Sequence, residues 1–343
     1  MTTKIDREKF LLTLESVSPG LSPREIIEQS NAFVFQGGMV KTFNDEIACR
    51  AKSQLDDGFE GAVPSGPLLE QMRKWKEEEI RIEPRDGELL IVGKRRRAAF
   101  RLEKEISLPV EAVDEPKKWR PLHDDFAEAV GIVGQCASRD ESKFETTCVH
   151  IAEKWVEAFD QYQLARWPLE TKIAKAVLVR QASIRHITSL GMTEFSETDA
   201  WLHFRNKAGL VLSCRRYLED YPDLELGLKM KKGVKVVLPK GLIEAAEKAQ
   251  IFSAEDPDNN LVSVEMRAGR IRIKGQGVSG WYSEVKKMEY KGPPLAFFIS
   301  PVLLAELIKH HNEVEIGDDR LKADTGKYVY VSSLMKPEEK GKQ

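Results

Sequence analysis

A glycine-rich segment, Gly275-Gln276-Gly277-Val278-Ser279-Gly280, matches the spacing of a known cofactor motif. Gly-x-Gly-x-x-Gly binds the pyrophosphate of a dinucleotide when it joins a strand to a helix, because the glycines permit a tight turn and the helix N-terminus faces the phosphates. Here the next residues, Trp281 to Val285, alternate between apolar and polar as a strand does. The helix that phosphate binding requires is missing, and we interpret the match as chance.

Patterns for metal binding are incomplete. The run from Asp256 to Asn260 begins like a calcium loop, but Leu261 occupies the sixth position, where glycine is needed, and Arg267 the twelfth, where glutamate is needed. His310 and His311 are adjacent, so on a helix their side chains would diverge by about 100°. We therefore expect no metal and no cofactor.

Nucleophiles and catalytic motifs give no clearer signal. The sequence has no Gly-x-x-x-x-Gly-Lys, no His-Glu-x-x-His and no Gly-x-Ser-x-Gly. Its 4 cysteines include no Cys-x-x-Cys, and we expect buried, reduced thiols at Cys49, Cys136, Cys148 and Cys214. The sequence predicts that the protein is not an enzyme. A hydrolase whose serine, histidine and aspartate meet only in space remains an alternative.

Bulk properties favour a globular protein with more than one domain. The chain has 343 residues and a formal net charge of -2. No apolar run approaches the length of a membrane span, and Met1 to Glu8 lack an apolar signal core. We expect a cytoplasmic protein with no membrane segment. The near-zero charge means either that the protein does not bind nucleic acid or that its cations gather on one surface.

Short amphipathic helices recur along the chain at a nearly constant interval. Each has apolar residues at spacings of three or four, which is the pattern of a helix that buries one stripe. The predicted helices begin near Asp6, Pro64, His123, Gln181, Pro239 and Ser300. Successive starts are about 58 to 61 residues apart, and such a constant step indicates a repeat architecture.

Between the helices the apolar period changes to two, which is typical of strands. Glu79 to Glu83 alternates and an Asp86-Gly87 turn leads into Leu89 to Val92, as expected of a hairpin. The same pattern occurs at Leu261 to Met266 with Ile271 to Ile273, at Glu313 to Ile316 and at Tyr328 to Val331. Helices on one face of antiparallel sheets predict an α+β fold.

Two repeats per domain predict three similar domains, at residues 1–116, 117–229 and 230–335, followed by a flexible charged tail at 336–343. Charged segments fall where this division needs linkers. They are Asp114-Glu115-Pro116-Lys117-Lys118 and Lys229-Met230-Lys231-Lys232-Gly233.

Several segments along the chain match one family in their order and spacing. They are Asp6-Arg7-Glu8, Val17 to Leu21, Leu89 to Arg97 with Phe100, Ala158 to Ala165, Tyr221-Pro222-Asp223, Ala249 to Ser253 and Tyr328 to Val331. In these segments the chain resembles the bacterial sliding clamp, the beta subunit of DNA polymerase III. The resemblance runs from about Ile5 to Val331 and rests on the order and spacing of the segments rather than on one motif.

The resemblance implies three clamp domains per chain, each with two helices on antiparallel sheets, and a ring formed by a head-to-tail homodimer. Such a ring encircles duplex DNA without reading its sequence and tethers the replicative polymerase. Its partners would be a DNA polymerase, a clamp loader and other proteins with clamp-binding peptides. The departures from the family favour a phage or mobile-element origin over a chromosomal one.

The DNA-facing helices should carry cations that attract phosphates weakly and regardless of sequence. The candidates are Arg24, Arg73, Lys74, Arg180, Arg185, Lys240 and Lys248. Arg24 stands where the family has a DNA-contacting arginine. The third helix departs from this expectation, since Asp124, Asp125 and Glu128 occupy its polar face. The alternative interpretation of each cation is an ordinary solvated charge.

The resemblance also implies a hydrophobic pocket for partner peptides. By position, its residues would be Phe144, Phe159, Tyr162, Leu164, Leu226, Leu228, Val329 and Val331. An apolar pocket with an aromatic rim suits the anchors of an extended peptide. Gln161-Tyr162-Gln163 replaces the family's Gly-His-Arg, which would alter the preferred peptide. The alternative is that these residues are plain core.

Ring closure would bring Ile251 and Phe252 against the first domain of a second chain near Arg96 and Arg97. The facing strand offers Glu284 but also Lys286 and Lys287, so the charges complement poorly. The run from Lys94 to Arg97 could instead be a nucleic-acid patch or a solvated strand face. A clamp-fold scaffold that binds proteins without encircling DNA is therefore the strongest alternative function.

Overall fold

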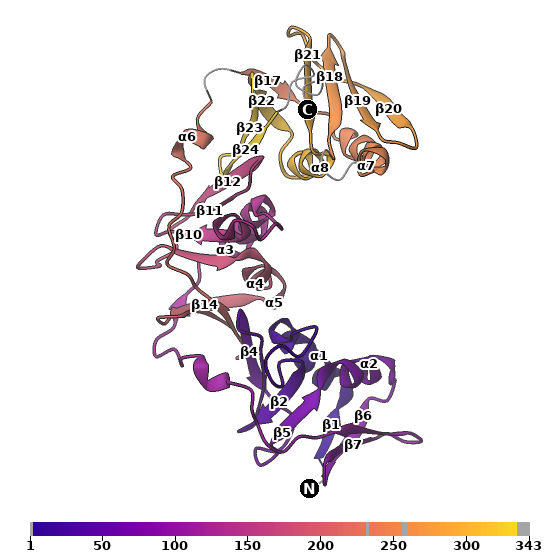
Figure 1. Ribbon diagram of the computed structural model, residues 1–343, viewed down its shortest axis with the longest axis vertical. Helices are drawn as coiled ribbons and strands as arrows, with labels where there is room; N and C mark the ends of the chain where they lie inside the picture. Colours follow the sequence, from indigo (N-terminus) through magenta and orange to yellow (C-terminus); the bar gives the residue numbers. More distant parts are fainter. Residues whose placement is uncertain (1–2, 231–232, 256–259, 335–343) are drawn as a thin grey trace. The chain divides into compact units, whose positions relative to one another are not determined.

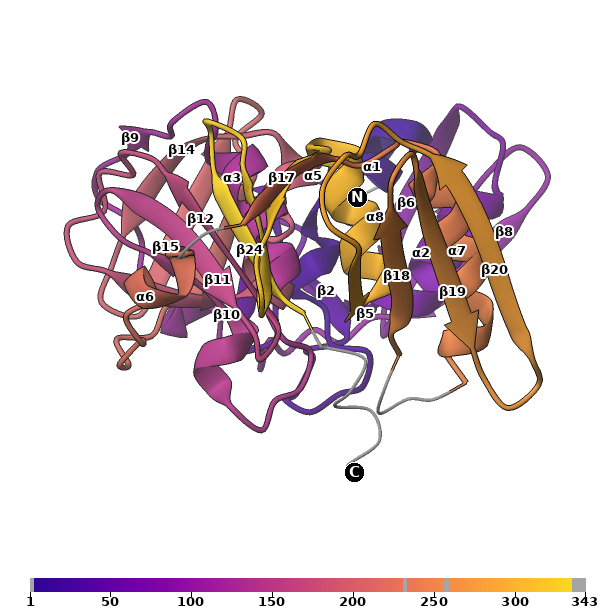
Figure 2. The same cartoon turned by 90° about the horizontal axis from the view of Figure 1, so that it is seen from above.

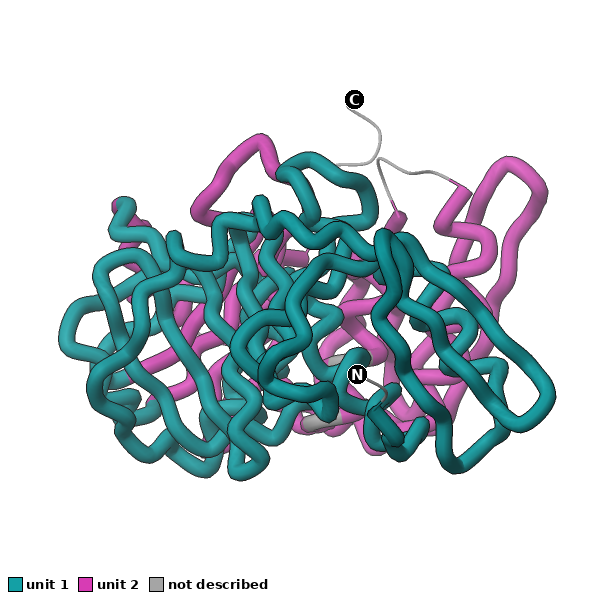
Figure 3. The backbone as a smooth tube through the Cα atoms, turned by 90° about the horizontal axis from the view of Figure 1, so that it is seen from below, with its two compact units in different colours: residues 1–134, 147–154, 169–219 teal, residues 135–146, 155–168, 220–343 magenta. Residues whose placement is uncertain are grey.

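The structure is a computed structural model that describes residues 3–230, 233–255 and 260–334. The predicted tail, 336–343, and most of the calcium-like run lie outside the described residues. The chain forms two compact units (Figure 3). Unit 1 contains residues 1–134, 147–154 and 169–219, and unit 2 contains residues 135–146, 155–168 and 220–343.

The described elements follow one another in a repeated order of one strand, one helical segment and three strands (Figure 1). The first two repeats, in unit 1, are β1 (Thr3–Asp6), α1 (Arg7–Val17), β2 (Ala32–Gln36), β3 (Met39–Phe43) and β4 (Ile47–Lys52), then β5 (Gly61–Pro64), α2 (Ser65–Lys74), β6 (Glu79–Arg85), β7 (Glu88–Val92) and β8 (Arg97–Arg101).

The middle two repeats contain a divided helix. They are β9 (Arg120–Pro121), α3 (Phe126–Val133), β10 (Cys148–Ile151), β11 (Trp155–Phe159) and β12 (Gln163–Pro168), then β13 (Val177–Arg180), α4 (Gln181–Ile184), α5 (Ile187–Leu190), β14 (Met192–Glu197), β15 (Trp201–Asn206) and β16 (Val211–Arg215). The strands β11 and β12 belong to unit 2 and the other elements to unit 1.

The last two repeats lie in unit 2, after the short helix α6 (Glu225–Leu228). They are β17 (Val234–Val237), α7 (Leu242–Ser253), β18 (Val262–Arg267), β19 (Arg270–Gln276) and β20 (Trp281–Lys287), then β21 (Leu295–Ile299), α8 (Pro301–His310), β22 (Glu313–Ile316), β23 (Arg320–Asp324) and β24 (Val329–Ser333).

Neighbouring repeats exchange their first strands. The strand β1 pairs with β6 while β5 pairs with β2, and β9 pairs with β14 while β13 pairs with β10. In unit 2, β17 pairs with β22 and β21 with β18. The helices also pack in pairs, α1 on α2, α3 on α5 and α7 on α8. Repeats are thus interlocked two by two, as the three predicted domains require, although the limits at 116/117 and 229/230 stay predictions.

The last strands of some repeats join sheets across the chain. In unit 1, β4 pairs with β16, so the first repeat meets the fourth. In unit 2, β12 pairs with β24, so the third repeat meets the sixth. Among the described residues, β8 and β20 are the last strands that stay at the edge of a sheet, next to β7 and β19 respectively. Their outer backbone groups are open to another strand.

Local sequence explains the starts of two described helices, α1 and α8. Asp6 caps α1 by accepting a hydrogen bond from the Lys9 amide at 3.0 Å, and Pro301 occupies the first turn of α8. The predicted starts near Asp6, Pro64 and Ser300 are confirmed. The third helix starts later than predicted, at Phe126.

The predicted fourth helix is divided between α4 and α5. Its hydroxyl side chains bond to the helix backbone, since Thr188 donates to the Arg185 carbonyl at 2.8 Å and Ser189 to the His186 carbonyl at 3.2 Å. These local bonds compete with regular helical hydrogen bonding, and apolar periodicity does not reveal them.

The glycine-rich motif is a hairpin turn between β19 and β20. The Gly277 amide donates to the Gly280 carbonyl at 2.9 Å, and a strand follows, so the interpretation as a chance match is confirmed. The glycines instead let α7 lie close to β19 (Figure 2). A Cβ at Gly275 would lie 2.0 Å from the Ala249 carbonyl oxygen, and one at Gly277 would lie 2.2 Å from that of Phe252.

The cysteine prediction is confirmed, because all 4 thiols are free and buried. Burial raises the pKa of Cys49 and of Cys148 to about 12. No described helix is long and apolar enough to cross a membrane.

Replacing Gly275 with alanine should destabilise the protein, because its Cβ would collide with the backbone of α7. Overpacking of this kind costs about 1–3 kcal/mol, so we expect a clearly lower thermal unfolding midpoint for Gly275→Ala. Gly66→Ala is the matched control, since a Cβ at Gly66 would meet nothing within 4 Å. Equal midpoints for the two variants would contradict this account of the packing.

Candidate functional site

Four of the predicted pocket residues share one face of the sheet in unit 2. Phe159 of β11 is the register partner of Leu164 in β12, and Leu164 is the partner of Val331 in β24. Val329 lies two positions from Val331 and so points to the same side. Val331 is buried, whereas Phe159, Leu164 and Val329 are partly exposed. The antiparallel pairing therefore gathers these apolar side chains from three chain segments.

The short helix α6 covers part of this face. It packs on β24, and a Cβ at Gly227 would lie 2.6 Å from Leu164 Cδ2. Tyr221 approaches the ring of Phe159 edge-on at 5.3 Å. Leu228 is partly buried, whereas Leu226 is 79% exposed. We call Phe159, Leu164, Tyr221, Leu226, Leu228 and Val329 the apolar surface of unit 2.

Arginines hold α6 in this position. Arg166 lies between two carboxylates, with Nε 2.6 Å from Glu157 Oε2 and Nη1 2.9 Å from Glu225 Oε2. Its guanidinium also lies over the ring of Trp155, at 4.7 Å from the centroid. Glu157 is almost fully buried, and a buried carboxylate needs such a partner.

From β23, Arg320 donates to the carbonyls of Gly227 and Lys229 at 3.1 and 3.2 Å. These supporting residues were not predicted from the sequence. The cross-strand pair Glu157 and Arg166 could have been found from strand alternation, but α6 is too short for a periodic signal.

Tyr162 and Phe144 complete the predicted set. Tyr162 is 56% exposed in the turn between β11 and β12, where Asp160 Oδ1 accepts hydrogen bonds from the amides of Tyr162 and Gln163 at 2.7 and 2.9 Å. The Ser333 amide donates to the Tyr162 carbonyl, which ties this turn to the end of β24. Phe144 is partly buried at the start of a 3-10 helix, Phe144–Thr147, and its role in the pocket stays a prediction.

The predicted DNA-binding cations fall into two groups. Arg24, Arg185 and Lys240 are exposed and make no ion pair within the described part of the chain. The others pair with acids. Arg73 lies 2.8 Å from Glu15, Lys74 2.5 Å from Glu70, Lys248 2.7 Å from Glu244 and Arg180 3.4 Å from Glu46. Exposed pairs contribute little stability, so a phosphate can replace the carboxylate at the first three. The side chain of Arg180 is only 25% exposed and is the least accessible.

Arg24 lies in a loop that is held firmly despite its exposure. The side chain of Gln29, which is buried, donates to Glu103 Oε2 at 3.0 Å and to the Glu105 carbonyl at 2.8 Å. Its oxygen accepts hydrogen bonds from the amides of Ser107 and Leu108 at 2.9 and 3.2 Å. A single buried glutamine thus fixes the segment that presents Arg24.

Acidic side chains dilute the positive charge near the third helix. Asp124 and Glu128 are exposed and Asp125 is partly exposed, as the sequence predicted for this polar face. Together with the ion pairs above, they give the predicted DNA-binding helices a mixed charge.

The predicted dimer residues lie at the two open sheet edges. Arg97 begins β8 and Arg96 lies in the preceding turn, and both are exposed; Arg96 Nε is 3.1 Å from Glu77 Oε1. On α7, Ile251 is 68% exposed and Phe252 is partly buried. The structure adds three exposed apolar residues near β20 that the sequence analysis missed, namely Val278, Trp281 and Val285. Their exposure on an edge strand is a tertiary property.

Comparison of the whole fold finds similar solved structures. No family model and no curated protein matches the sequence. Among solved structures, the DNA polymerase III beta subunit of Thermotoga maritima superposes with a TM-score of 0.81 at 14% identity, covering 98% of this chain and 99% of that chain. The Pseudomonas aeruginosa sliding clamp bound to griselimycin gives 0.80 at 15% identity, covering 98% and 99%. The beta subunit of Streptococcus pyogenes gives 0.80 at 15% identity, covering 98% and 100%.

This chain has the sliding-clamp fold. The fold that the sequence resemblance implied is confirmed over nearly the whole chain.

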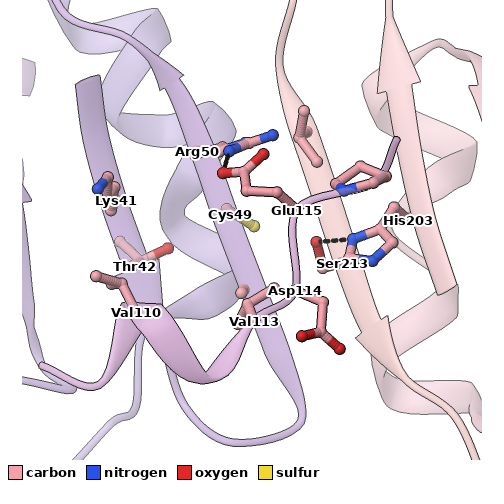
Figure 4. A pocket seen from close by; sticks show the side chains of 13 residues that line it. Lys41, Thr42, Cys49, Arg50, Val110, Val113, Asp114, Glu115, His203 and Ser213 are labelled. Carbon is pink, nitrogen blue, oxygen red and sulfur yellow. Dashed lines mark hydrogen bonds and ion pairs between the residues drawn. The ribbon is translucent and has the colours of Figure 1, made fainter. Parts of the chain in front are cut away.

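A small pocket in unit 1 bears on the alternative of a hydrolase (Figure 4). It has a volume of about 60 Å³ and lies where β4 meets β16 in the clamp fold. His203 Nδ1 is 2.7 Å from Ser213 Oγ, but the two residues are 0% and 3% exposed. His203 Nε2 faces the Thr198 hydroxyl at 3.0 Å rather than a carboxylate. Within the described residues His203 bonds to Ser213 and Thr198, so the pair lacks the carboxylate that would orient a catalytic base.

His203 should make stability depend on pH. Burial, and secondarily the charge of Arg50, lower the pKa of His203 from 6.5 to about 4. Between these values the unfolded chain binds a proton that the folded protein does not, so stability is full above pH 6.5 and is lost as the pH falls toward 4. The shift corresponds to roughly 3 kcal/mol.

The free energy of unfolding should fall less for His203→Gln than for the parent protein when the pH is lowered from 6.5 to 4. It is measured by urea titration at each pH. Identical pH dependence in the two proteins would show that His203 is not the group responsible.

Proposed function

We propose that this protein is a DNA polymerase processivity factor, a non-enzymatic sliding clamp that encircles duplex DNA in the cytoplasm. Two copies would form a head-to-tail ring, placed on DNA by a clamp loader and bound by the replicative polymerase and other partners through short peptides. The open edges of β8 and β20 are the observation that carries this proposal.

The last strands of the repeats pair at a fixed interval along the chain, and the last strands of the second and fifth repeats lack such a partner among the described residues. The last strand of the first repeat pairs with that of the fourth, and that of the third with that of the sixth. In both pairs the partners are three repeats apart. The fifth repeat ends in β20, and counting three repeats on passes the end of the chain and reaches the second repeat of another copy, which ends in β8. A second chain supplies the missing strand, and the reciprocal contact closes the assembly.

Side chains at the two edges support this contact. Ile251 of α7 is 68% exposed beside β20, and an adjoining strand and its sheet would cover it. On the other edge, Ala98 and Ala99 of β8 are small and permit close approach. Lys286 and Lys287 face Arg96 and Arg97 in this arrangement, so apolar burial and backbone hydrogen bonds must supply most of the affinity.

Ring closure predicts a dimer that one charge can break. Ile251→Asp should reduce the mass in solution at micromolar concentration from that of two chains to that of one, because the contact would bury the carboxylate. Leu218→Asp is the control, since Leu218 is 50% exposed on the segment after β16, outside both edges. Mass is measured by light scattering.

The parent protein should also remain on nicked circular DNA and leave linear DNA after loading by the cognate loader. A parent monomer, or equal loss from both DNAs, would discard encircling in favour of a clamp-fold scaffold.

The apolar surface of unit 2 is the proposed peptide site. Leu164 and Val329 form its floor, Leu226 stands exposed at its rim, and Arg166 and Arg320 keep α6 in place. A hydrophobic side chain of an extended peptide would gain most by covering Leu226 and the ring of Phe159.

Leu226→Ser should weaken binding of the cognate polymerase about tenfold, because it removes an anchor contact without disturbing the core. Leu218→Ser makes the same change at another exposed leucine and should leave binding unchanged. The affinity is measured with the clamp immobilised on a surface and the polymerase in solution. Equal affinities for the parent and Leu226→Ser would place the peptide site elsewhere.

A further inference from the structure

The outward face of the sheet β21-β18-β19-β20 is strongly basic. Alternate residues of these strands point toward α7 and are buried, as Ile271 and Ile273 are in β19. The opposite positions carry the charges. The cations are Arg267, Arg270, Arg272, Lys274 and Lys287. Glu265 is the acidic residue at the outward positions of these described strands, and its carboxylate lies 3.9 Å from Arg272.

These cations stand close together by register. Arg270 is the cross-strand partner of both Arg267 and Lys287, so three like charges lie in one row. Arg270, Arg272 and Lys274 occupy alternate positions of β19, about 7 Å apart along the strand. Like charges directly opposite one another repel and destabilise a sheet. A bound polyanion would remove this repulsion.

Aromatic and recessed surfaces accompany the charges. Trp281 is 64% exposed, and the Lys274 ammonium lies 5.7 Å from the centre of its ring. Beside it is a groove of about 290 Å³, whose lining includes Ser263, Lys274, Gln276 and Phe298 together with the acidic Glu265. A flat exposed ring next to cations offers a stacking surface for a base whose phosphates contact the cations.

The corresponding sheet of unit 1, β1-β6-β7-β8, provides an internal comparison. Three of its outward cations are paired with acids, since Lys4 lies 2.6 Å from Glu79, Arg85 3.5 Å from Glu83 and Arg101 3.1 Å from Glu103, whereas Arg81 and Arg97 have no ion pair within the described residues. On the outward face of the unit 2 sheet, the ion pair within the described residues is the long contact between Arg272 and Glu265. The outward face of the unit 2 sheet therefore carries more uncompensated positive charge than the outward face of the unit 1 sheet.

We propose that the outward face of β18–β21 binds single-stranded DNA. The cation row suits a phosphate backbone, and Trp281 suits an unstacked base, which duplex DNA does not present and an acidic peptide does not possess. This surface is distinct from the helices proposed to face duplex DNA, and binding there does not require ring closure.

The test uses fluorescence anisotropy of a labelled thymidine oligonucleotide with the full-length protein and no loader. The parent should bind with an affinity that falls with salt. Replacing Arg270, Arg272 and Lys274 by glutamine should weaken binding at least tenfold and reduce the slope of log affinity against log salt by about 2, for three lost phosphate contacts. Trp281→Ala should weaken it about tenfold through lost stacking.

Matched controls test whether binding depends on this face rather than on total positive charge or on the proposed clamp activity. The first control replaces Lys4, Arg81 and Arg85 together by glutamine, which removes the same charge from the unit 1 sheet. The second control combines Arg185→Gln with Lys240→Gln. Both controls should leave the affinity for the oligonucleotide unchanged. The β19 triple variant should still be a dimer and remain on circular duplex DNA.

Unchanged binding by the β19 triple variant, or an equal loss in the unit 1 control, overturns the proposal. If polyglutamate competed as strongly as unlabelled oligonucleotide and Trp281→Ala had no effect, the face would instead bind an acidic protein.

Discussion

Hydrogen bonding between the edges of short strands organises this protein. Its described strands are 2 to 7 residues long, and strands of this length are stable only as part of larger sheets. Each unpaired edge exposes backbone donors and acceptors that favour another strand. Exchange of first strands interlocks neighbouring repeats, and pairing of last strands joins repeats that are distant in sequence. Among the described strands, β8 and β20 keep open edges, and in the proposed dimer the same constraint would join them to a second chain.

The apolar surface of unit 2 is a consequence of one such pairing. When β12 pairs with β24, Leu164 comes to lie beside Val331, and the outward face gains side chains from both ends of unit 2. The short helix α6 then lies over this face, where Arg166 and Arg320 hold it. Because Glu157 is buried beneath Arg166, removing the arginine would leave a carboxylate without its partner. The polar network therefore determines the shape of an apolar site.

The small net charge of -2 conceals a strongly uneven distribution. Several cations on helices are paired with acids one turn away, as Lys74 is with Glu70 and Lys248 with Glu244, which moderates any attraction for phosphate. On the outward face of β19 the cations are left largely uncompensated. Sheet register makes the difference, because alternation collects every second residue of a strand on one face whereas a helix distributes its charges around an axis.

The sequence by itself determined the local elements and their order. Alternation revealed the hairpin of β6 and β7 around Asp86-Gly87, and three-to-four spacing with Asp6 and Ser300 located α1 and α8, because these signals arise between residues close in the chain. Only the tertiary structure decided which strands became edges, that α6 covers Leu164, and that Ser213 meets a buried His203 instead of a substrate. Those features depend on contacts between residues far apart in the chain, for which periodicity carries no signal.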